Sequence, residues 1–308
     1  PVDIVSGQGA VLTDVNGKEY IDLGSGIAVN TFGACDPVWI DAVTAQLHQI
    51  AHTSNLYFTA PQTRLAKMLC ERTGMKKVFF GNSGAEANEG ALKIARKWGN
   101  DATNGQKHVI VTLKNSFHGR TIATLAATGQ DHFHQHFGPF PEGFRYVTAG
   151  DKDELETALA QGDVCAVLME MVQGEGGVNV LEPDYVTFAA EACKRHDALL
   201  MVDEVQTGNG RTGKLCAYMH YGITPDVVTT AKGLAGGLPM GAVLMGEKAE
   251  HVLGPGDHGS TFGGNPVCAA GACSVMERLD DQLMADVQRK SALIRAVLEN
   301  AAGVTEVT

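Results

Sequence analysis

The strongest constraint on the fold is an alternation, from residue 76 onward, of short apolar runs with longer segments of helical periodicity. The runs at 164–172 and 198–205 are apolar at nearly every position, which is typical of strands that helices cover on both faces. We therefore predict an α/β fold with a mostly parallel sheet sandwiched by helices, in which ligands bind at the carboxyl ends of the strands. The strands predicted in this region are 76–80, 107–113, 164–172, 198–205 and 226–233.

The composition excludes several other classes of protein. The 308 residues suffice for about two domains, and their net charge of −11 gives no general attraction to nucleic acid or to an anionic membrane. We expect neither as a partner. No apolar run reaches the ~18 residues of a membrane span, and the first residues lack a signal-peptide pattern. The seven cysteines form no C-x-x-C pair, and Cys165 and Cys193 lie in apolar segments, which predicts free core thiols and a cytoplasmic protein.

A glycine-rich segment, GNSGAEANEG (81–90), connects a predicted strand to a predicted helix. Small residues at a helix N-terminus leave backbone N–H groups free to bind a phosphate. The same segment also fits a tight turn in which Ser83 caps the helix and Glu86 completes a capping box. The segment alone does not separate these two interpretations.

Two carboxylates, Asp203 and Glu204, end a predicted buried strand. A buried aspartate needs a cationic partner, which could be the protonated ring nitrogen of a cofactor. Alternatively, one of the carboxylates pairs with Arg211, which is close in the sequence. Residues 208–214 also fit the start of a P-loop, but Leu215 stands where a serine or threonine would bind Mg²⁺, which argues against a nucleotide hydrolase.

Lys232 follows the last predicted strand and precedes a glycine-rich turn. Burial lowers the pKa of a lysine, as an amine that forms a Schiff base requires; alternatively, the side chain extends from the strand end into solvent. In NSFHGRT (115–121), Phe117 could stack on a planar ring and Arg120 could bind a carboxylate, or the two could be a core phenylalanine and a surface arginine. The segment HGSTFGGNP (258–266) is by itself only a loop.

Three histidines, His132, His134 and His136, occupy alternate positions, so a strand would place them on one face as metal ligands. Gly138 and Pro139 follow directly and favour an irregular loop. We therefore predict no metal site.

Together these segments resemble the class III, ornithine-type aminotransferases, which depend on pyridoxal phosphate. The resemblance covers essentially the whole chain and implies a fold-type I transferase with residues 51–270 as the large cofactor-binding domain. Residues 1–50 would be the N-terminal segment of a smaller domain and 271–308 the start of its C-terminal part, with an arginine for the second substrate expected beyond residue 308. The segments that carry the resemblance are NSGAEANE, SFHGRT, QGEGG (173–177), DEVQTGNGRTG, TTAKGLAGG and GSTFGGNP, in the family's order.

The resemblance implies roles for the residues at matching positions. Lys232 would bind the cofactor covalently and move a proton at the reacting carbon, and Asp203 would keep the pyridine nitrogen protonated. The other cofactor contacts implied are Ser83, Gly84 and Ala85 at the phosphate, Phe117 stacked on the ring, Gln206 near the phenolic oxygen, Glu170 beside the cofactor, and Thr261 on the phosphate from the other subunit. The substrate-binding residues implied are Arg120 at a carboxylate, Ser260, Asn55 and Tyr57.

Two further segments narrow the expected substrate. IDLGSGIAVN (21–30) and HTSNLYFTAPQ (52–62) are most similar to family members that act on N-acetylornithine or N-succinylornithine. We expect N-acetylornithine as the amino donor in arginine metabolism, 2-oxoglutarate as the acceptor, and a homodimer. Succinylornithine, ornithine and 4-aminobutyrate are alternative donors, and a non-catalytic protein that binds pyridoxal phosphate is the alternative from another class. Two positions depart from the family pattern. FGACDP (32–37) differs in the segment expected to cap the site, and Met171 stands where the family commonly has proline, which we expect to affect packing.

Overall fold

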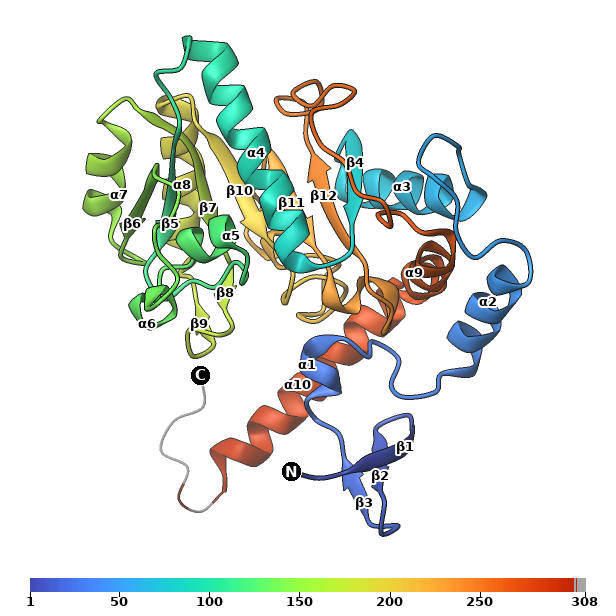
Figure 1. Cartoon of the computed structure of the whole chain (residues 1–308). Helices are drawn as coiled ribbons and strands as arrows, with labels where there is room; N and C mark the ends of the chain where they lie inside the picture. The colour runs from blue at the N-terminus through green and yellow to red at the C-terminus, as the bar shows by residue number, and fades with distance from the viewer. Residues whose placement is uncertain (302, 304–308) are drawn as a thin grey trace.

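The centre of the fold is a seven-stranded sheet with helices on both faces, in a computed structural model that describes residues 1–301 and 303 (Figure 1). In spatial order the strands are β4 (Lys77–Gly81), β12 (Gly241–Met245), β11 (Val227–Thr230), β10 (Leu199–Asp203), β7 (Val164–Met169), β5 (Val109–Leu113) and β6 (Phe144–Val147). Within this sheet β12 runs antiparallel to both of its neighbours, and the other pairs are parallel. The prediction of a mostly parallel α/β sheet is confirmed.

Successive residues of the central strands face opposite helical layers, which explains why the apolar runs are continuous. In β10, Leu199 and Met201 pack with the apolar face of α4 (Gly84–Thr103), and Leu200 and Val202 pack in the core on the other face. Among the helices that contribute to that second core are α3 (Ala60–Thr73), α7 (Lys152–Leu159), α8 (Pro183–Arg195) and α9 (Pro266–Arg278). Cys165 and Cys193 are buried free thiols, one in each core, as predicted.

The N-terminal segment forms a small antiparallel sheet of β1 (Ile4–Gln8), β2 (Val11–Asp14) and β3 (Glu19–Ile21), with α1 (Ser25–Ala28) and α2 (Pro37–Leu47) after it. In the FGACDP segment, Asp36 caps α2 and forms an ion pair with Arg278 of α9, and the Arg278 guanidinium lies 3.7 Å from the centre of the Phe32 ring. This segment therefore anchors α2 to the core helix α9.

The remaining elements are short, except for the last helix. They are α5 (Ile122–Ala127), α6 (Asp131–His134), β8 (Val172–Gln173) paired with β9 (Asn179–Val180), the 3₁₀ helices η1 (Ala217–His220) and η2 (Lys232–Ala235), and α10 (Asp281–Glu299). Figure 1 shows α10 extending away from the sheet past α1. Residue 270, the expected end of the large domain, lies inside helix α9. Within the described part of the chain, none of the helices combines the length and apolar character needed to cross a bilayer.

The topology explains why distant motifs meet. Five strands that run in the same direction each end directly before a segment that the sequence analysis selected. Because the carboxyl ends of such strands share one edge of the sheet, those segments converge there. The segments are residues 82–86 after β4, 115–121 after β5, Glu170 after β7, Asp203 at the end of β10, and Lys232 after β11.

Candidate active site

Asp203 lies at the carboxyl end of the central strand β10, and its side chain is 4% exposed. Its Oδ2 accepts hydrogen bonds from His118 Nδ1 at 2.8 Å and Asn88 Nδ2 at 2.7 Å. Its Oδ1 accepts one bond, from the Val205 backbone N–H at 2.9 Å. A carboxylate oxygen accommodates two acceptor bonds, so Oδ1 has room for one more donor.

Glu204 is buried for a structural reason. Its carboxylate accepts hydrogen bonds from the Thr207 hydroxyl at 2.6 Å and from the backbone N–H groups of Ala217 and Tyr218 at 2.9 and 2.8 Å. Burial raises the pKa of Glu204 to about 7, against the effect of these donors. Neither Asp203 nor Glu204 forms an ion pair with Arg211 in the described structure, so the alternative based on that pairing is not supported.

Lys232 is the first residue of η2, directly beyond the end of β11, and it is half-buried. Burial lowers the pKa of Lys232, and the charges of Glu175, Asp203 and Glu170 act in the opposite direction. The backbone of Lys232 has φ 45°, in the left-handed region, which is uncommon for a residue with a side chain. Strained backbone of this kind is frequent at functional sites. Because Lys232 is half-buried, its side chain does not simply extend into solvent.

The N-terminus of α4 combines features of both interpretations of the glycine-rich segment. Ser83 caps the helix by accepting the Glu86 N–H at 3.1 Å, whereas the Glu86 carboxylate accepts the N–H of Asn82, one residue before the expected partner. The capping box is therefore only half formed. No acceptor among the described residues takes the backbone N–H groups of Gly84 and Ala85, which stay available to an anion. A Cβ on Gly84 would lie 2.6 Å from Val205, so glycine is required for α4 to approach the end of β10.

Phe117, Arg120 and Glu170 lie at the ends of β5 and β7. The Arg120 guanidinium is exposed and lies 5.4 Å from the centre of the Phe117 ring and 4.5 Å from that of Phe133. Glu170 is 5% exposed and accepts the Phe117 N–H at 2.9 Å, and burial raises its pKa to about 7. Glu170 thus fixes the backbone that carries the aromatic ring. Gln206 is half-buried against Gly174.

The loop at 258–266 joins the site at the start of α4. Ser260 Oγ accepts the Asn82 side-chain amide at 3.1 Å, and the Asn55 amide donates to the Ser260 carbonyl at 3.1 Å. Thr261 and Tyr57 are exposed, and in the described part of this single chain they form no hydrogen bond with Lys232 or Asp203. Met171, the other departure from the family pattern, is fully buried in the core.

Three residues at the site were missed from the sequence. His118 and Asn88 hold Asp203, and the charge of Glu175 acts on Lys232. Each lies inside a motif that the sequence analysis selected: NSFHGRT, NSGAEANE and QGEGG. In an α-helix, residues four apart share a face, so the position of Asn88 relative to Gly84 was an available signal.

The three histidines do not share one face of a strand, the arrangement that would gather them as metal ligands. His132 and His134 lie in the short helix α6 instead of the predicted loop, and the His134 ring contacts the Leu125 carbonyl at 2.8 Å. Across the described residues no group of three potential ligands is close enough to hold a metal ion.

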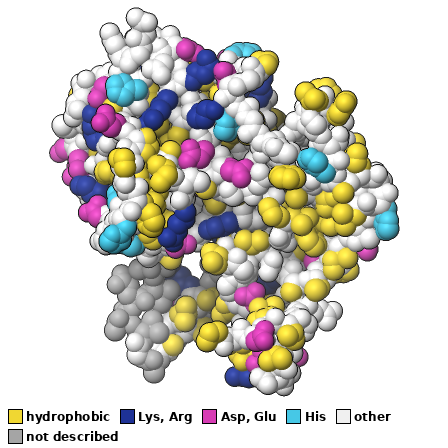
Figure 2. All heavy atoms as spheres, in the orientation of Figure 1, with side chains coloured by type: hydrophobic (Ala, Val, Ile, Leu, Met, Phe, Trp, Pro, Cys, Tyr) yellow, Lys and Arg dark blue, Asp and Glu magenta, His cyan; other side chains and the backbone are white. Residues whose placement is uncertain are grey.

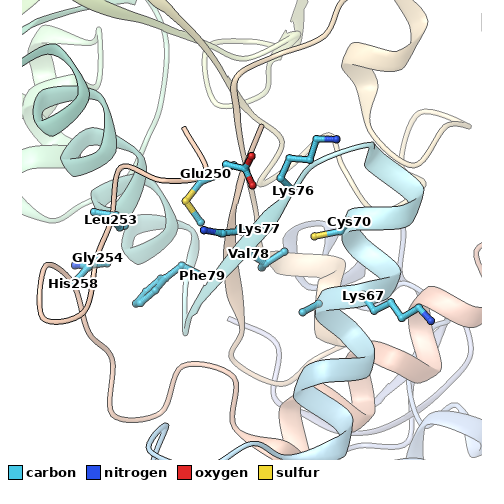
Figure 3. Close-up of a pocket in the computed structure, with 12 residues that line it drawn as sticks. Lys67, Cys70, Lys76, Lys77, Val78, Phe79, Glu250, Leu253, Gly254 and His258 are labelled. Atoms are coloured by element: carbon cyan, nitrogen blue, oxygen red, sulfur yellow. The ribbon is translucent and has the colours of Figure 1, made fainter. Parts of the chain in front are cut away.

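Two cavities have linings that include none of the predicted catalytic or binding residues. One, of about 520 Å³, lies between α3, β4 and the loop at 246–258, and Figure 3 shows Cys70, Phe79 and His258 along it. None of the predicted catalytic or binding residues lines it. A second, of about 180 Å³, adjoins the Lys232 backbone. Its lining comes from Ser25–Thr31, the turn Gly208–Arg211, Gly233 and the first turns of α10.

The match to known proteins covers the chain almost completely. A model of the class-III aminotransferase family matches residues 1–307, and the chain belongs to this family. Members of the family depend on pyridoxal phosphate, and the chain is accordingly a pyridoxal-phosphate-dependent transaminase by family. The family, fold class and cofactor expected from the sequence are confirmed.

Among individual proteins, the chain is similar to the acetylornithine aminotransferase of Haemophilus ducreyi, with 51% identity over 302 residues, 98% of this chain and 77% of that protein. It is 49% identical over 277 residues to a succinylornithine transaminase of Salmonella paratyphi A, covering 90% of this chain and 68% of that protein. The ornithine aminotransferase structure from Toxoplasma gondii superposes with a TM-score of 0.94 at 37% identity, covering 99% of this chain and 74% of that one. A second structure of the Toxoplasma enzyme is described with pyridoxal phosphate at its active site.

Proposed function

We propose that the protein transfers the terminal amino group of N-acetylornithine to 2-oxoglutarate. The observation that carries the assignment is the convergence of a half-buried lysine of lowered pKa with a buried aspartate at the ends of adjacent strands. Similarity to relatives named acetylornithine aminotransferase supports the choice of donor. Succinylornithine and ornithine remain competing donors, because relatives with those names are also similar.

The described residues fit the cofactor at three points. The free N–H groups of Gly84 and Ala85 lie in the first turn of the helix that Ser83 caps, and they would bind its phosphate because a helix N-terminus carries a partial positive charge. Asp203 Oδ1 would accept the N–H of the pyridine ring, and Lys232 would bind the aldehyde carbon. Pyridoxal phosphate supplies an electron sink for the substrate carbon that loses a proton.

The protein side chains would then perform the remaining steps. The Lys232 amine, with its pKa lowered by burial, is suited to take a proton from the substrate carbon and return it at the cofactor carbon. Phe117 would stack on the ring, and Gln206 would lie near its phenolic oxygen. Arg120 would bind the substrate carboxylate while resting on the Phe133 ring.

A homodimer is part of this proposal. Leu56, Tyr57 and Phe58 are 86%, 64% and 94% exposed, and Phe262 beside Thr261 is 60% exposed. Hydrogen bonds from Asn55 to the 260–263 loop join these residues into one apolar patch. Figure 2 shows hydrophobic side chains gathered on the side of the molecule where α2, α3 and α9 lie. Association through this patch would let Thr261 reach the phosphate in the partner subunit.

We also propose a division into two domains and a cytoplasmic location. Residues 51–270 contain all strands of the large sheet, and residues 1–50 and 271–308 would belong to the smaller domain. Seven free cysteines are consistent with a reducing compartment.

A spectroscopic titration tests the function. The protein loaded with pyridoxal phosphate should show a visible absorbance band that shifts on addition of N-acetylornithine, at lower concentrations than with succinylornithine, ornithine or 4-aminobutyrate. Subsequent addition of 2-oxoglutarate should restore the band. A band that no donor shifts would indicate a non-catalytic cofactor-binding protein, and a chain that develops no band would refute the proposal.

A further inference from the structure

Asn88 is a fully buried amide in α4, with 1% exposure and every polar atom in use. Its Nδ2 donates to Asp203 Oδ2 at 2.7 Å and to the His118 carbonyl at 2.8 Å. Its Oδ1 accepts the Thr229 hydroxyl at 2.7 Å. Thr229 lies opposite Asp203 on the neighbouring strand β11.

These bonds fix the orientation of the amide. The Thr229 hydroxyl offers a donor to Oδ1, and a carboxylate and a carbonyl offer acceptors to Nδ2. A flipped amide would place its oxygen against two acceptors, which is unfavourable. Asn88 therefore presents only N–H groups to Asp203. Together with His118 it fills Oδ2 and leaves the remaining acceptor capacity on Oδ1.

The same amide joins four elements that surround the cofactor position. Asn88 lies one turn after Gly84 in α4, at the proposed phosphate site. It contacts β10 through Asp203, the segment after β5 through His118, and β11 through Thr229, three residues before Lys232. Each hydrogen bond of Asn88 is to a backbone atom or to a short side chain. A small shift of one of these elements therefore changes the hydrogen bonds that Asn88 makes to the others.

We propose that Asn88 is a positioning residue that directs Asp203 Oδ1 toward the ring nitrogen, with Thr229 setting the orientation of the Asn88 amide. The inference rests on the proposed role of Asp203. A purely structural role would instead predict that changes at Asn88 alter stability alone and leave the cofactor spectrum unchanged.

Substitution Asn88→Asp tests the inference in the protein loaded with pyridoxal phosphate. The new carboxyl group would lie against Asp203 Oδ2, so the pair must share a proton and titrate as a unit. Asp203, His118, Glu170 and Lys232 are present in both proteins, so a difference in the pH titration of the visible band reports the new pair. We expect an additional titration step, a cofactor dissociation constant changed by less than about tenfold, and kcat lowered about 10- to 100-fold, as for hydrogen-bond partners that orient metal ligands.

Substitution Thr229→Val provides a second test if Asn88→Asp fails to fold. It removes the donor that orients the amide while nearly conserving shape. Its matched control is Thr112→Val, because the Thr112 hydroxyl is buried on β5 without a hydrogen-bond partner in the described structure. We expect Thr229→Val to lower kcat with little change in KM and to alter the pH titration of the band, and Thr112→Val to do neither.

The outcomes separate this inference from the proposed function. If the unsubstituted protein shows no cofactor band, or its band does not respond to any donor, the proposed function fails. If that protein responds but Thr229→Val and Asn88→Asp reproduce its pH titration and kcat, the inference alone is wrong.

Discussion

At the scale of single residues, the chemistry of the site depends on where ordinary side chains are placed. Asp203 and Glu204 are adjacent and both buried, yet one faces His118 and Asn88 and the other holds a loop through Thr207 and two backbone N–H groups. Successive strand residues point to opposite faces, which separates their environments. Adjacent carboxylates in the sequence therefore have unrelated functions.

Substitution Lys232→Ala should abolish transamination while the protein still binds pyridoxal phosphate. The amine is the proposed covalent partner and proton carrier, whereas the N-terminus of α4 binds the phosphate independently. Alanine retains a Cβ, so the left-handed backbone at this position stays equally strained. Cofactor binding is measured by absorbance and turnover by a coupled assay. Lys67→Ala, on the exposed surface of α3, is the control, and measurable turnover in Lys232→Ala would contradict the assignment.

Substitution Asp203→Asn should preserve the fold and lower kcat by about 10²- to 10⁴-fold, the usual range for loss of a proton-transfer group. His118 and Asn88 both donate to Oδ2, so the amide oxygen of the variant must take that position. The amide nitrogen would then face the ring, where it cannot hold a proton on the pyridine nitrogen. Steady-state kinetics with N-acetylornithine measure the effect, and a rate close to that of the unsubstituted protein would refute the role.

At the scale of elements, the features that could be predicted from the sequence are those that depend on a local pattern of residues. The strands of the large sheet were identifiable because both of their faces are buried, which makes their sequences continuously apolar. The sequence did not predict that His118 and Asn88 would hold Asp203. A buried polar side chain has no sequence signature that distinguishes it from an exposed one until its partner is known, and these partners lie 85 and 115 positions away.

Glu204 gives the loop between β10 and η1 a dependence on pH. Its pKa is raised from 4.5 to about 7 in the folded protein, so folding takes up a proton between those pH values. The free energy of unfolding should therefore fall as pH rises from about 4.5 to 7, because the unfolded state binds fewer protons. Glu204→Gln should reduce this decline, although Glu170 contributes in the same direction. Urea unfolding of both proteins at pH 5 and 7.5 measures the difference, and equal declines would contradict the prediction.

At the scale of the whole molecule, one group of exposed apolar side chains lies beside the loop that carries Ser260 and Thr261. Phe58 and Leu56 are among the most exposed large apolar side chains, and Phe262 lies in the loop that carries Ser260 and Thr261. Patches of this kind mark association surfaces. The proposed dimer would therefore cover the patch and close the site in one step.

Substitution Phe58→Asp should yield a monomer in sedimentation velocity experiments and weaken binding of pyridoxal phosphate. The side chain is 94% exposed in the single chain, so the folded monomer should tolerate the change. Val15→Asp, at a residue 61% exposed in the N-terminal hairpin, is the matched control and should leave the assembly state unchanged. If Phe58→Asp sediments like the unsubstituted protein, this patch is not the interface.

The position of β12 between β4 and β11 has a consequence for biosynthesis. Within the described residues, β4 pairs with no strand other than β12, and Gly81 lies opposite Gly241. During translation the first strand of the sheet therefore emerges from the ribosome long before β12, with residues 82–240 made in between. Pairing over such a sequence separation is slow, and an unpaired apolar strand invites aggregation in the nascent chain. Chaperone demand in the cell should therefore be greatest until the ribosome has released residue 245 and β4 gains its partner.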